Sequence, residues 1–327
     1  MLSHALTVLS PAPAPDKLSY GNFTAAIRRF EADMALGPRT HPRLFLGGGS
    51  RFRAVAMMTR ENSNPKLAKL GRPAAGLYST LSLSLAPADM AGIDLCPMRS
   101  ASCTAGCLGH NSGHSAMGRG AANDRSVMTM VRQARIRRTQ ALFGSDLFTS
   151  HNALQSITAE IRAFVKRCKR RGVFPAVRMN AFSDIVWEKV WPELFTRFPM
   201  VTFYDYTKIP SRMYGTLPQN YSLTFSRSET NEGHAVAVLQ KTIHSVAIVF
   251  GVKNPADMPT SWNGFRVIDG TADDMRFLDA PNTIVGLSWK GPTSKAAYTE
   301  SLTAAIAAGF AVPVPGRIPA PATSLTR

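Results

Sequence analysis

Three of the four cysteines lie within a dozen residues, and their thiols could bind a metal. Cys96, Cys103 and Cys107 are separated by six and three residues in a loop rich in serine and glycine. Thiolates are soft ligands that suit zinc and iron–sulfur clusters. Structural zinc sites commonly use two closely spaced cysteine pairs, and this loop does not contain two. An iron–sulfur cluster bound by three cysteines would leave one iron open for a small ligand.

Two other interpretations of the cysteine loop stay open at the level of sequence. His110 and His114 follow the cysteines closely and could complete a zinc site of three cysteines and one histidine. The loop could also bind no metal. Four cysteines are too few for a disulfide scaffold. Cys168, on a basic helix, is interpreted as an incidental thiol.

Polar residues also gather where predicted strands end. Strands covered by helices on both faces should be almost continuously apolar, so polar groups here either satisfy one another or face a ligand. The alternative is structural, because an aspartate can cap a following helix and a lysine can be solvated. We predict catalytic roles for Asp184, Asp205, Lys208, Glu229 and Lys290, and cofactor-binding roles for Asn180, Asn231 and Asp269.

Two predicted helices carry clusters of basic residues that could neutralise phosphates. The alternative is a solvated helix face. Aromatic residues are sparse within these helices, so base-specific recognition is not supported. The predicted nucleic-acid-binding residues are Arg132, Arg135, Arg137, Arg138, Lys166, Arg167, Lys169, Arg170 and Arg171.

Composition agrees with a basic globular protein. Lys and Arg number 38 against 21 Asp and Glu, which gives a formal net charge of +17 over 327 residues and favours polyanionic partners. Hydrophobic residues make up 45%, which excludes wholesale disorder. No uninterrupted apolar stretch is long enough to cross a membrane, and no secretory signal is recognisable, so we expect a cytoplasmic protein. Phosphate-binding glycine loops, zinc-protease motifs and nucleophile elbows are absent from the sequence.

The elements that must position these residues alternate between strands and helices. Such alternation predicts parallel βαβ units and favours a partial or closed parallel (β/α) barrel over an open doubly wound sheet. Working residues in either fold lie at the carboxyl ends of strands. We predict an N-terminal extension over 1–75, a barrel-like domain over 76–310 and a proline-rich tail over 311–327. Predicted strands cover 77–85, 176–181, 201–206, 221–226, 245–252, 265–269 and 283–288, and predicted helices cover 22–36, 121–143, 152–171, 185–197, 232–242, 273–278 and 295–308.

The cysteine loop follows the first predicted strand of the barrel-like domain. This arrangement resembles that of the radical S-adenosylmethionine enzymes, whose cluster loop follows the first strand of a partial α/β barrel. Their usual Cys-x3-Cys-x2-Cys motif differs from the spacing found here. The resemblance implies a [4Fe–4S] cluster and S-adenosylmethionine as cofactors, by analogy of plan alone.

Several short blocks of sequence, in their order along the chain, resemble the gene product 88 domain family of bacteriophage proteins. Examples are Val177-Arg178-Met179-Asn180 and Phe203-Tyr204-Asp205-Tyr206-Thr207-Lys208. The resemblance covers roughly residues 45–292 and implies a phage gene expressed in the host cytoplasm. Where relatives tend to have Gly-Thr, this chain has Ala181-Phe182. Further blocks lie at 83–88, 96–97, 107–108, 135–139, 183–185, 223–226, 267–270, 276–279, 285–287 and 290–291.

Two functions are therefore expected. The first is an iron–sulfur enzyme that acts on a nucleotide or nucleic acid. The second is a non-catalytic nucleic-acid-binding protein whose cysteine loop holds structural zinc or no metal.

Overall fold

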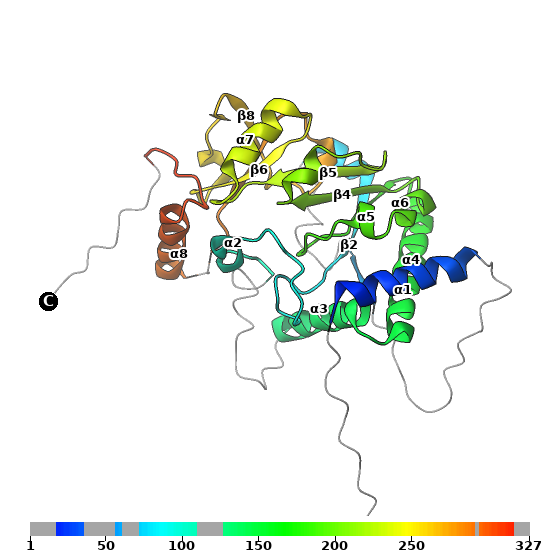
Figure 1. Ribbon diagram of the computed structural model, residues 1–327. Helices are drawn as coiled ribbons and strands as arrows, with labels where there is room; N and C mark the ends of the chain where they lie inside the picture. Colours follow the sequence, from blue (N-terminus) through cyan, green and yellow to red (C-terminus); the bar gives the residue numbers. More distant parts are fainter. Residues whose placement is uncertain (1–17, 36–55, 61–71, 110–126, 292–293, 317–327) are drawn as a thin grey trace, which may run out of the picture.

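The protein folds around one mixed, largely parallel β-sheet with helices packed against it (Figure 1). The computed structural model describes residues 18–35, 56–60, 72–109, 127–291 and 294–316. The strand order is β1-β2-β3-β4-β5-β6-β9-β8-β7, and only the edge strands β1 and β7 pair antiparallel with their neighbours. The strands are β1 (Met58–Arg60), β2 (Tyr78–Leu83), β3 (Phe174–Arg178), β4 (Thr202–Thr207), β5 (Tyr221–Ser226), β6 (Val246–Phe250), β7 (Ser261–Trp262), β8 (Phe265–Asp269) and β9 (Ile284–Ser288).

The predicted α/β class and parallel sheet are confirmed, but the described strands do not close into a barrel. β1 and β7 are the two free edges of the sheet within the described part of the chain. The order also departs from that of the chain, because β9 lies between β6 and β8. β9 is buried along most of its length, whereas β8 exposes Arg266 and Asp269. The more apolar strand therefore takes the interior place.

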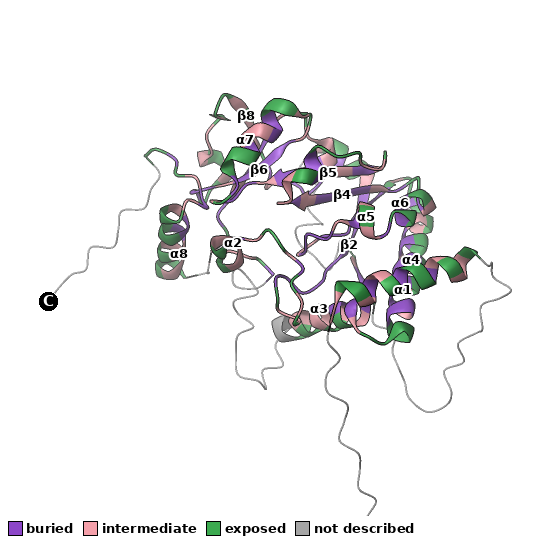
Figure 2. Cartoon of the chain, in the orientation of Figure 1, coloured by how far each residue is buried: buried purple, intermediate pink, exposed green. Residues whose placement is uncertain are grey.

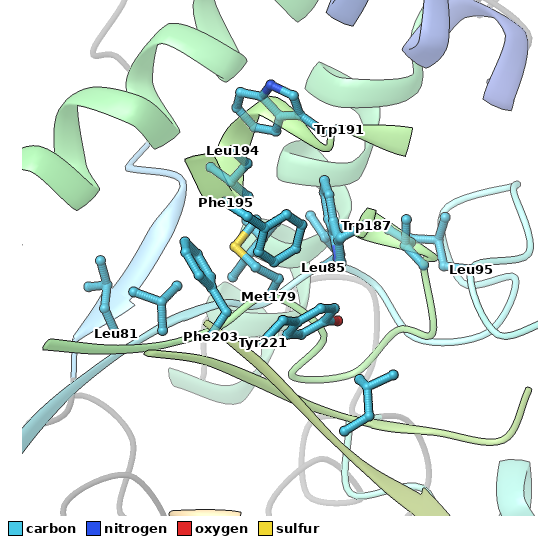
Figure 3. Packing of buried hydrophobic residues seen from close by; sticks show 14 of the residues in the cluster. Leu81, Leu85, Leu95, Met179, Trp187, Trp191, Leu194, Phe195, Phe203 and Tyr221 are labelled. Atoms are coloured by element: carbon cyan, nitrogen blue, oxygen red, sulfur yellow. The ribbon is translucent and has the colours of Figure 1, made fainter. Parts of the chain in front are cut away.

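One face of the sheet packs against helices through a large apolar core. Trp187, Trp191, Phe195 and Phe203 are among its fully or almost fully buried side chains (Figure 3). The strands β2 to β6 and β9 are mostly buried, and the outward helix faces are exposed (Figure 2). The helices are α1 (Tyr20–Ala35), α2 (Ala101–Ala105), α3 (Val127–Phe143), α4 (Leu147–Arg171), α5 (Trp187–Val190), α6 (Glu193–Arg197), α7 (Glu232–Lys241) and α8 (Lys295–Ala307).

Helix boundaries differ from the predicted ones for local reasons. α4 begins five residues earlier than predicted, because the Asp146 side chain accepts hydrogen bonds from the Phe148 and Thr149 amides and caps the helix. The predicted helix over 185–197 is divided into α5 and α6 at Pro192, which lacks an amide donor. The predicted helix over 273–278 is only a short 3-10 turn, Arg276–Leu278.

The opposite face of the sheet is polar and is covered by the chain between β8 and β9. Phe277 from this segment packs against Tyr78 of β2 and Tyr204 of β4, with ring centroids 4.9 and 5.2 Å apart. Arg178 of β3 donates to Asp274 at 2.7 Å. Arg72, which precedes β2, donates to Asp273 and Asp279. These ion pairs hold the first parallel strand and the β8–β9 connection together.

No helix among the described residues combines the length and the apolar character needed to cross a membrane.

Candidate functional site

The cysteine loop follows β2 and lies at the carboxyl edge of the parallel strands (Figure 1). Its backbone is tied to the end of β3, because the amide of Asp184 donates to the carbonyl of Leu95 at 2.7 Å. The Cys96 thiol donates to the carbonyl of Phe182 at 3.4 Å. The loop therefore lies against the strand end that the sequence singles out as polar.

Arg135 of α3 holds the far end of the same loop. Its guanidinium donates to the carbonyl of Gly109 at 3.0 Å and lies 4.0 Å from the centre of the Phe182 ring. Gly109 is packed so tightly that an added Cβ would lie 2.6 Å from that ring. Arg135 is buried in these contacts, so the guanidinium that was predicted to bind nucleic acid is engaged within the chain.

Glu229, from the loop after β5, anchors the short helix that carries Cys103. Its carboxylate accepts hydrogen bonds from the Ser100 hydroxyl at 2.8 Å and from the Ser102 amide at 3.2 Å. Ser100 in turn caps α2 by accepting from the amide of Cys103. Burial alone would raise the pKa of Glu229, but hydrogen bonds from its own amide, Ser100 and Ser102 hold this pKa below its ordinary value.

Glu229→Ala is expected to loosen the cysteine helix without unfolding the protein. The change removes two hydrogen bonds to a charged acceptor, each of which contributes about 1.5–3 kcal/mol. We therefore expect amide hydrogen exchange over residues 100–105 to accelerate by about tenfold or more. Glu232→Ala is the matched control, because Glu232 pairs with Arg227 and is half exposed. Equal exchange in the two variants would contradict this anchoring role.

The Cys96 thiol is held in its protonated form. Burial, together with the nearby Cys107 thiol, Asp184 and Cys103 thiol, raises its pKa to about 12, although a hydrogen bond from the Ala88 backbone acts in the opposite direction. Such a thiol is a poor nucleophile at neutral pH. A metal cation would reverse this preference, since a coordinating thiol loses its proton.

The described residues do not form an assembled metal site. The loop cysteines form no disulfide and are partly buried, but in the described ranges no three His, Cys, Asp or Glu side chains are grouped closely enough to hold a metal ion. His110 and His114 lie outside the described residues. Cys168 is buried in the apolar core on α4, away from the cysteine loop. The three thiols of the loop thus fit a thiophilic metal in kind, but the structure does not bring them together as a metal site.

Asp184 lies in a buried polar cluster beside the cysteine loop. Its carboxylate accepts from the Lys208 amide at 2.7 Å and from Arg212 at 3.0 Å. Arg212 also pairs with Glu188 and donates to the Tyr221 hydroxyl. Burial raises the pKa of Asp184, although Arg212 and the Lys208 amide lower it. Arg212 was not predicted, because nothing in the local sequence shows that it turns back toward β3.

Asn180 is engaged in the fold. Its Oδ1 accepts from the Ser183 hydroxyl, the Ile185 amide and the Trp187 indole, and its Nδ2 donates to the Ile185 carbonyl at 2.9 Å. These contacts turn the chain after β3 and occupy the side-chain oxygen with three donors. The structure therefore places Asn180 beneath the loop, where it shapes the site that it was predicted to line.

Asp205 projects to the helix-covered face of β4. It accepts from the Asn180 amide at 2.6 Å and from the Tyr221 hydroxyl at 2.8 Å. Burial raises its pKa to about 7, although the Asn180 amide, Arg178, Tyr221 and Arg212 lower it. Asp205 is 1% exposed, which leaves it in contact with the protein rather than with solvent.

Lys208 and Asn231 lie at the ends of β4 and β5. The Lys208 ammonium donates to the Ser226 hydroxyl at 2.6 Å, and Asn231 donates to the Ser226 carbonyl at 3.1 Å. Asn231 also accepts from the Ser228 amide at 2.6 Å. Lys208 is half-buried, and its ammonium has three donors, one of which is directed to the Ser226 hydroxyl. It is therefore a cation that these strand ends can offer to an anionic ligand.

Lys290 and Asp269 lie farther along the sheet. Lys290 is exposed after β9, next to Trp289, whose ring packs against Gly106 and Cys103 of the cysteine loop. The Trp289 indole also donates to the Ser301 hydroxyl of α8 at 3.1 Å. Asp269 is exposed and accepts from the amide and hydroxyl of Thr271 in a turn. The described contacts do not bring Asp269 to the other predicted residues.

The basic residues fall into three groups. Arg138, like Arg135, is committed within the chain and donates to the carbonyls of Ala56 and Ser84. Arg132 and Arg167 are half-buried, and Arg167 lies over the ring of Phe164. The remaining predicted residues are exposed: Arg137, Lys166, Lys169, Arg170 and Arg171.

Comparison with known proteins identifies a family. A family model described as gene product 88 matches residues 56–311, most of the chain, which confirms the resemblance seen in the sequence. No curated protein and no solved structure matches the chain.

Proposed function

This chain belongs to the gene product 88 family, and we propose that it is a phage-encoded metalloprotein that binds an iron–sulfur cluster through Cys96, Cys103 and Cys107. The observation that carries this proposal is the place of the three thiols. They lie on one anchored loop, in no disulfide, at the carboxyl edge of a parallel sheet and beside charged strand ends.

The contacts around the loop suit a bound cluster better than a nucleophilic thiol. Glu229 and Arg135 fix the loop on both sides of Cys103. A cluster held by three thiolates supplies, when bound, an open iron that can take a small ligand such as S-adenosylmethionine. Cys96 loses its proton when it binds metal, because a cation outweighs the burial that keeps the free thiol neutral.

The substrate that we propose is a nucleotide or a nucleic acid. Lys208 presents a half-buried ammonium group at the strand ends, where it can pair with a phosphate. Its backbone amide is held by Asp184, which fixes the start of the lysine side chain. The net charge of +17 favours a polyanion over a neutral substrate.

Analysis of iron, sulfide and zinc in anaerobically purified protein tests the proposal. We expect about four iron and four sulfide per chain, with a brown colour and a visible absorption band. Iron and sulfide should both vanish in a triple variant that carries Cys96→Ala, Cys103→Ala and Cys107→Ala. They should persist in Cys168→Ala, the matched control, because Cys168 lies in the apolar core. Circular dichroism verifies that each variant is folded. Zinc, or no metal, in the wild-type protein would overturn the iron–sulfur proposal.

A second candidate is a non-catalytic nucleic-acid-binding protein with structural zinc or a metal-free loop. The observation that favours it is the set of exposed cations on α4, together with the lack of an assembled metal site in the described ranges. The metal analysis separates the two candidates, because only the first requires iron and sulfide.

A further inference from the structure

Arg135 differs from the other buried arginines of the described chain in having no carboxylate partner. Five arginines in the described ranges are at most 9% exposed. Four of them form ion pairs: Arg178 with Asp274, Arg212 with Asp184, Arg227 with Glu232 and Arg276 with Asp273. A buried charge is costly unless it is paired. The charge of Arg135 therefore calls for a partner other than an aspartate or glutamate of these ranges.

The contacts of Arg135 place its guanidinium against the cysteine loop. Its Nη1 donates to the carbonyl of Gly109, two residues after Cys107, at 3.0 Å. Its central carbon lies 4.0 Å from the centre of the Phe182 ring, and the Phe182 carbonyl accepts a hydrogen bond from the Cys96 thiol. Arg135 thus contacts the segment that follows one loop cysteine and the residue that holds another.

These contacts leave the charge of Arg135 only partly compensated. A carbonyl and an aromatic ring attract a cation, but neither carries a formal negative charge. The Nε atom is buried and has no hydrogen-bond partner among the described residues. Burial, together with the nearby Arg138, lowers the pKa of Arg135 to about 10, although the Cys107 thiol acts in the opposite direction. Arg135 is therefore still a cation at neutral pH.

The carboxylates that lie near the cysteine loop have other partners. Asp184 pairs with Arg212 at 3.0 Å. Glu229 accepts from the Ser100 hydroxyl and the Ser102 amide at the start of the cysteine helix. The thiols of the loop are consequently the groups beside Arg135 that can bring it a negative charge.

We propose that Arg135 is the counter-charge of an anionic thiolate–metal centre at the cysteine loop. The inference rests on the proposed function in one respect, because it requires the loop to bind a metal through its three thiolates. A divalent cation held by three thiolates carries a net negative charge, and so does an iron–sulfur cluster held in this way. Arg135 would stabilise that charge without being a ligand, since a guanidinium has no acceptor to offer a metal.

The alternative role for Arg135 is a clamp that only holds the Gly109 carbonyl. Glutamine and lysine can both donate to a carbonyl, but only lysine keeps the charge. Arg135→Gln and Arg135→Lys therefore separate the two roles. Arg137→Gln is the matched control, because Arg137 lies on the same helix and is exposed.

Titration of the reduced, metal-free protein with Cd²⁺ in competition with a chelator tests the proposal. The ultraviolet absorption of cadmium–thiolate bonds reports binding, and the triple cysteine variant gives the background. We expect Arg135→Gln to weaken Cd²⁺ binding by about tenfold, because charges a few ångströms apart interact at least this strongly in a partly buried site. Arg135→Lys and Arg137→Gln should stay within about threefold of the wild-type protein.

Stability of the metal-free variants is a second measurement. Neutral replacement removes a poorly compensated buried charge, so metal-free Arg135→Gln and Arg135→Met should unfold in urea at or above the wild-type midpoint. A clamp predicts the reverse. Failure of both neutral variants to fold, while Arg135→Lys folds, would show that the charge serves the fold itself and would overturn the proposal.

The outcomes distinguish this proposal from the iron–sulfur proposal. Where the protein holds iron and sulfide, Arg135→Gln should lower the reduction potential relative to Arg135→Lys, because reduction adds negative charge; a tenfold effect corresponds to about 59 mV. Equal Cd²⁺ affinities in Arg135→Gln and Arg135→Lys overturn the counter-charge and leave the cluster intact. A wild-type protein without iron that binds Cd²⁺ with the expected dependence overturns only the cluster. Uptake of neither metal overturns both.

Discussion

Arg212→Met is expected to lower the free energy of unfolding by about 3–5 kcal/mol. Arg212 is 4% exposed and pairs with two carboxylates, Asp184 at 3.0 Å and Glu188 at 2.8 Å. It also donates to the hydroxyl of Tyr221 at 2.9 Å. Methionine fills much of the volume but leaves these buried acceptors without a counter-charge. The cost comes chiefly from those stranded groups and less from the ion pairs themselves.

Urea denaturation followed by circular dichroism measures this loss. Arg99→Met is the control, because Arg99 pairs with Asp89 and Asp94 near the surface, and we expect it to cost less than about 1 kcal/mol. A double variant with Glu188→Gln should recover part of the loss, since it removes one of the stranded charges. A cost for Arg212→Met as small as that of Arg99→Met would show that the cluster is solvated in the native protein.

The second large effect is a pH dependence of stability that comes from Asp205. Burial raises the pKa of this carboxyl to about 7 in the folded protein, against an ordinary value of 3.8. The folded state therefore binds the proton more tightly than the unfolded state does, and ionisation disfavours folding. The contribution of Asp205 to stability should be greatest below about pH 4, fall between about pH 4 and pH 7, and level off above. A shift of this size corresponds to about 4 kcal/mol.

Comparison of the wild-type protein with Asp205→Asn isolates this effect. Carboxyls with lowered pKa values, such as Glu229 and Asp273, act in the opposite direction, but they are present in both proteins and cancel in the difference. We expect the stability of the wild-type protein to fall relative to Asp205→Asn as the pH rises from about 4 to 7. A difference that stays constant across this range would show that Asp205 ionises in the folded protein as it does in water.

The positions of most strands followed from the sequence because their signal is local. Tyr221–Ser226 and Phe265–Asp269 are predicted and observed with the same bounds, since apolar residues and flanking turns mark them in the chain. β1 and β7 were missed, because strands of three and two residues carry too little pattern to detect. The order of β8 and β9 was also missed, because their placement depends on which strand is buried more fully in the sheet.

The candidate site could be predicted as a region but not as a set of roles. Parallel strands bring their carboxyl ends to one edge, so the proximity of Asn180, Asp184 and Lys208 followed from the predicted fold. The sequence did not show that the Asn180 side-chain oxygen accepts from three groups of the fold, nor that Asp205 faces the helices. Glu229 was predicted as catalytic, and the structure places it as the anchor of the cysteine helix.

By itself the sequence determined the α/β class, the family, the basic charge and the clustering of three thiols on one loop. Each of these depends on composition, short-range periodicity or the order of motifs. Only the tertiary structure decided the partners of the buried charges, as in the pairing of Arg72 with Asp273 across 201 residues. An ion pair or a stacked ring depends on distance in space, and the folded sheet sets that distance between residues that are remote along the chain.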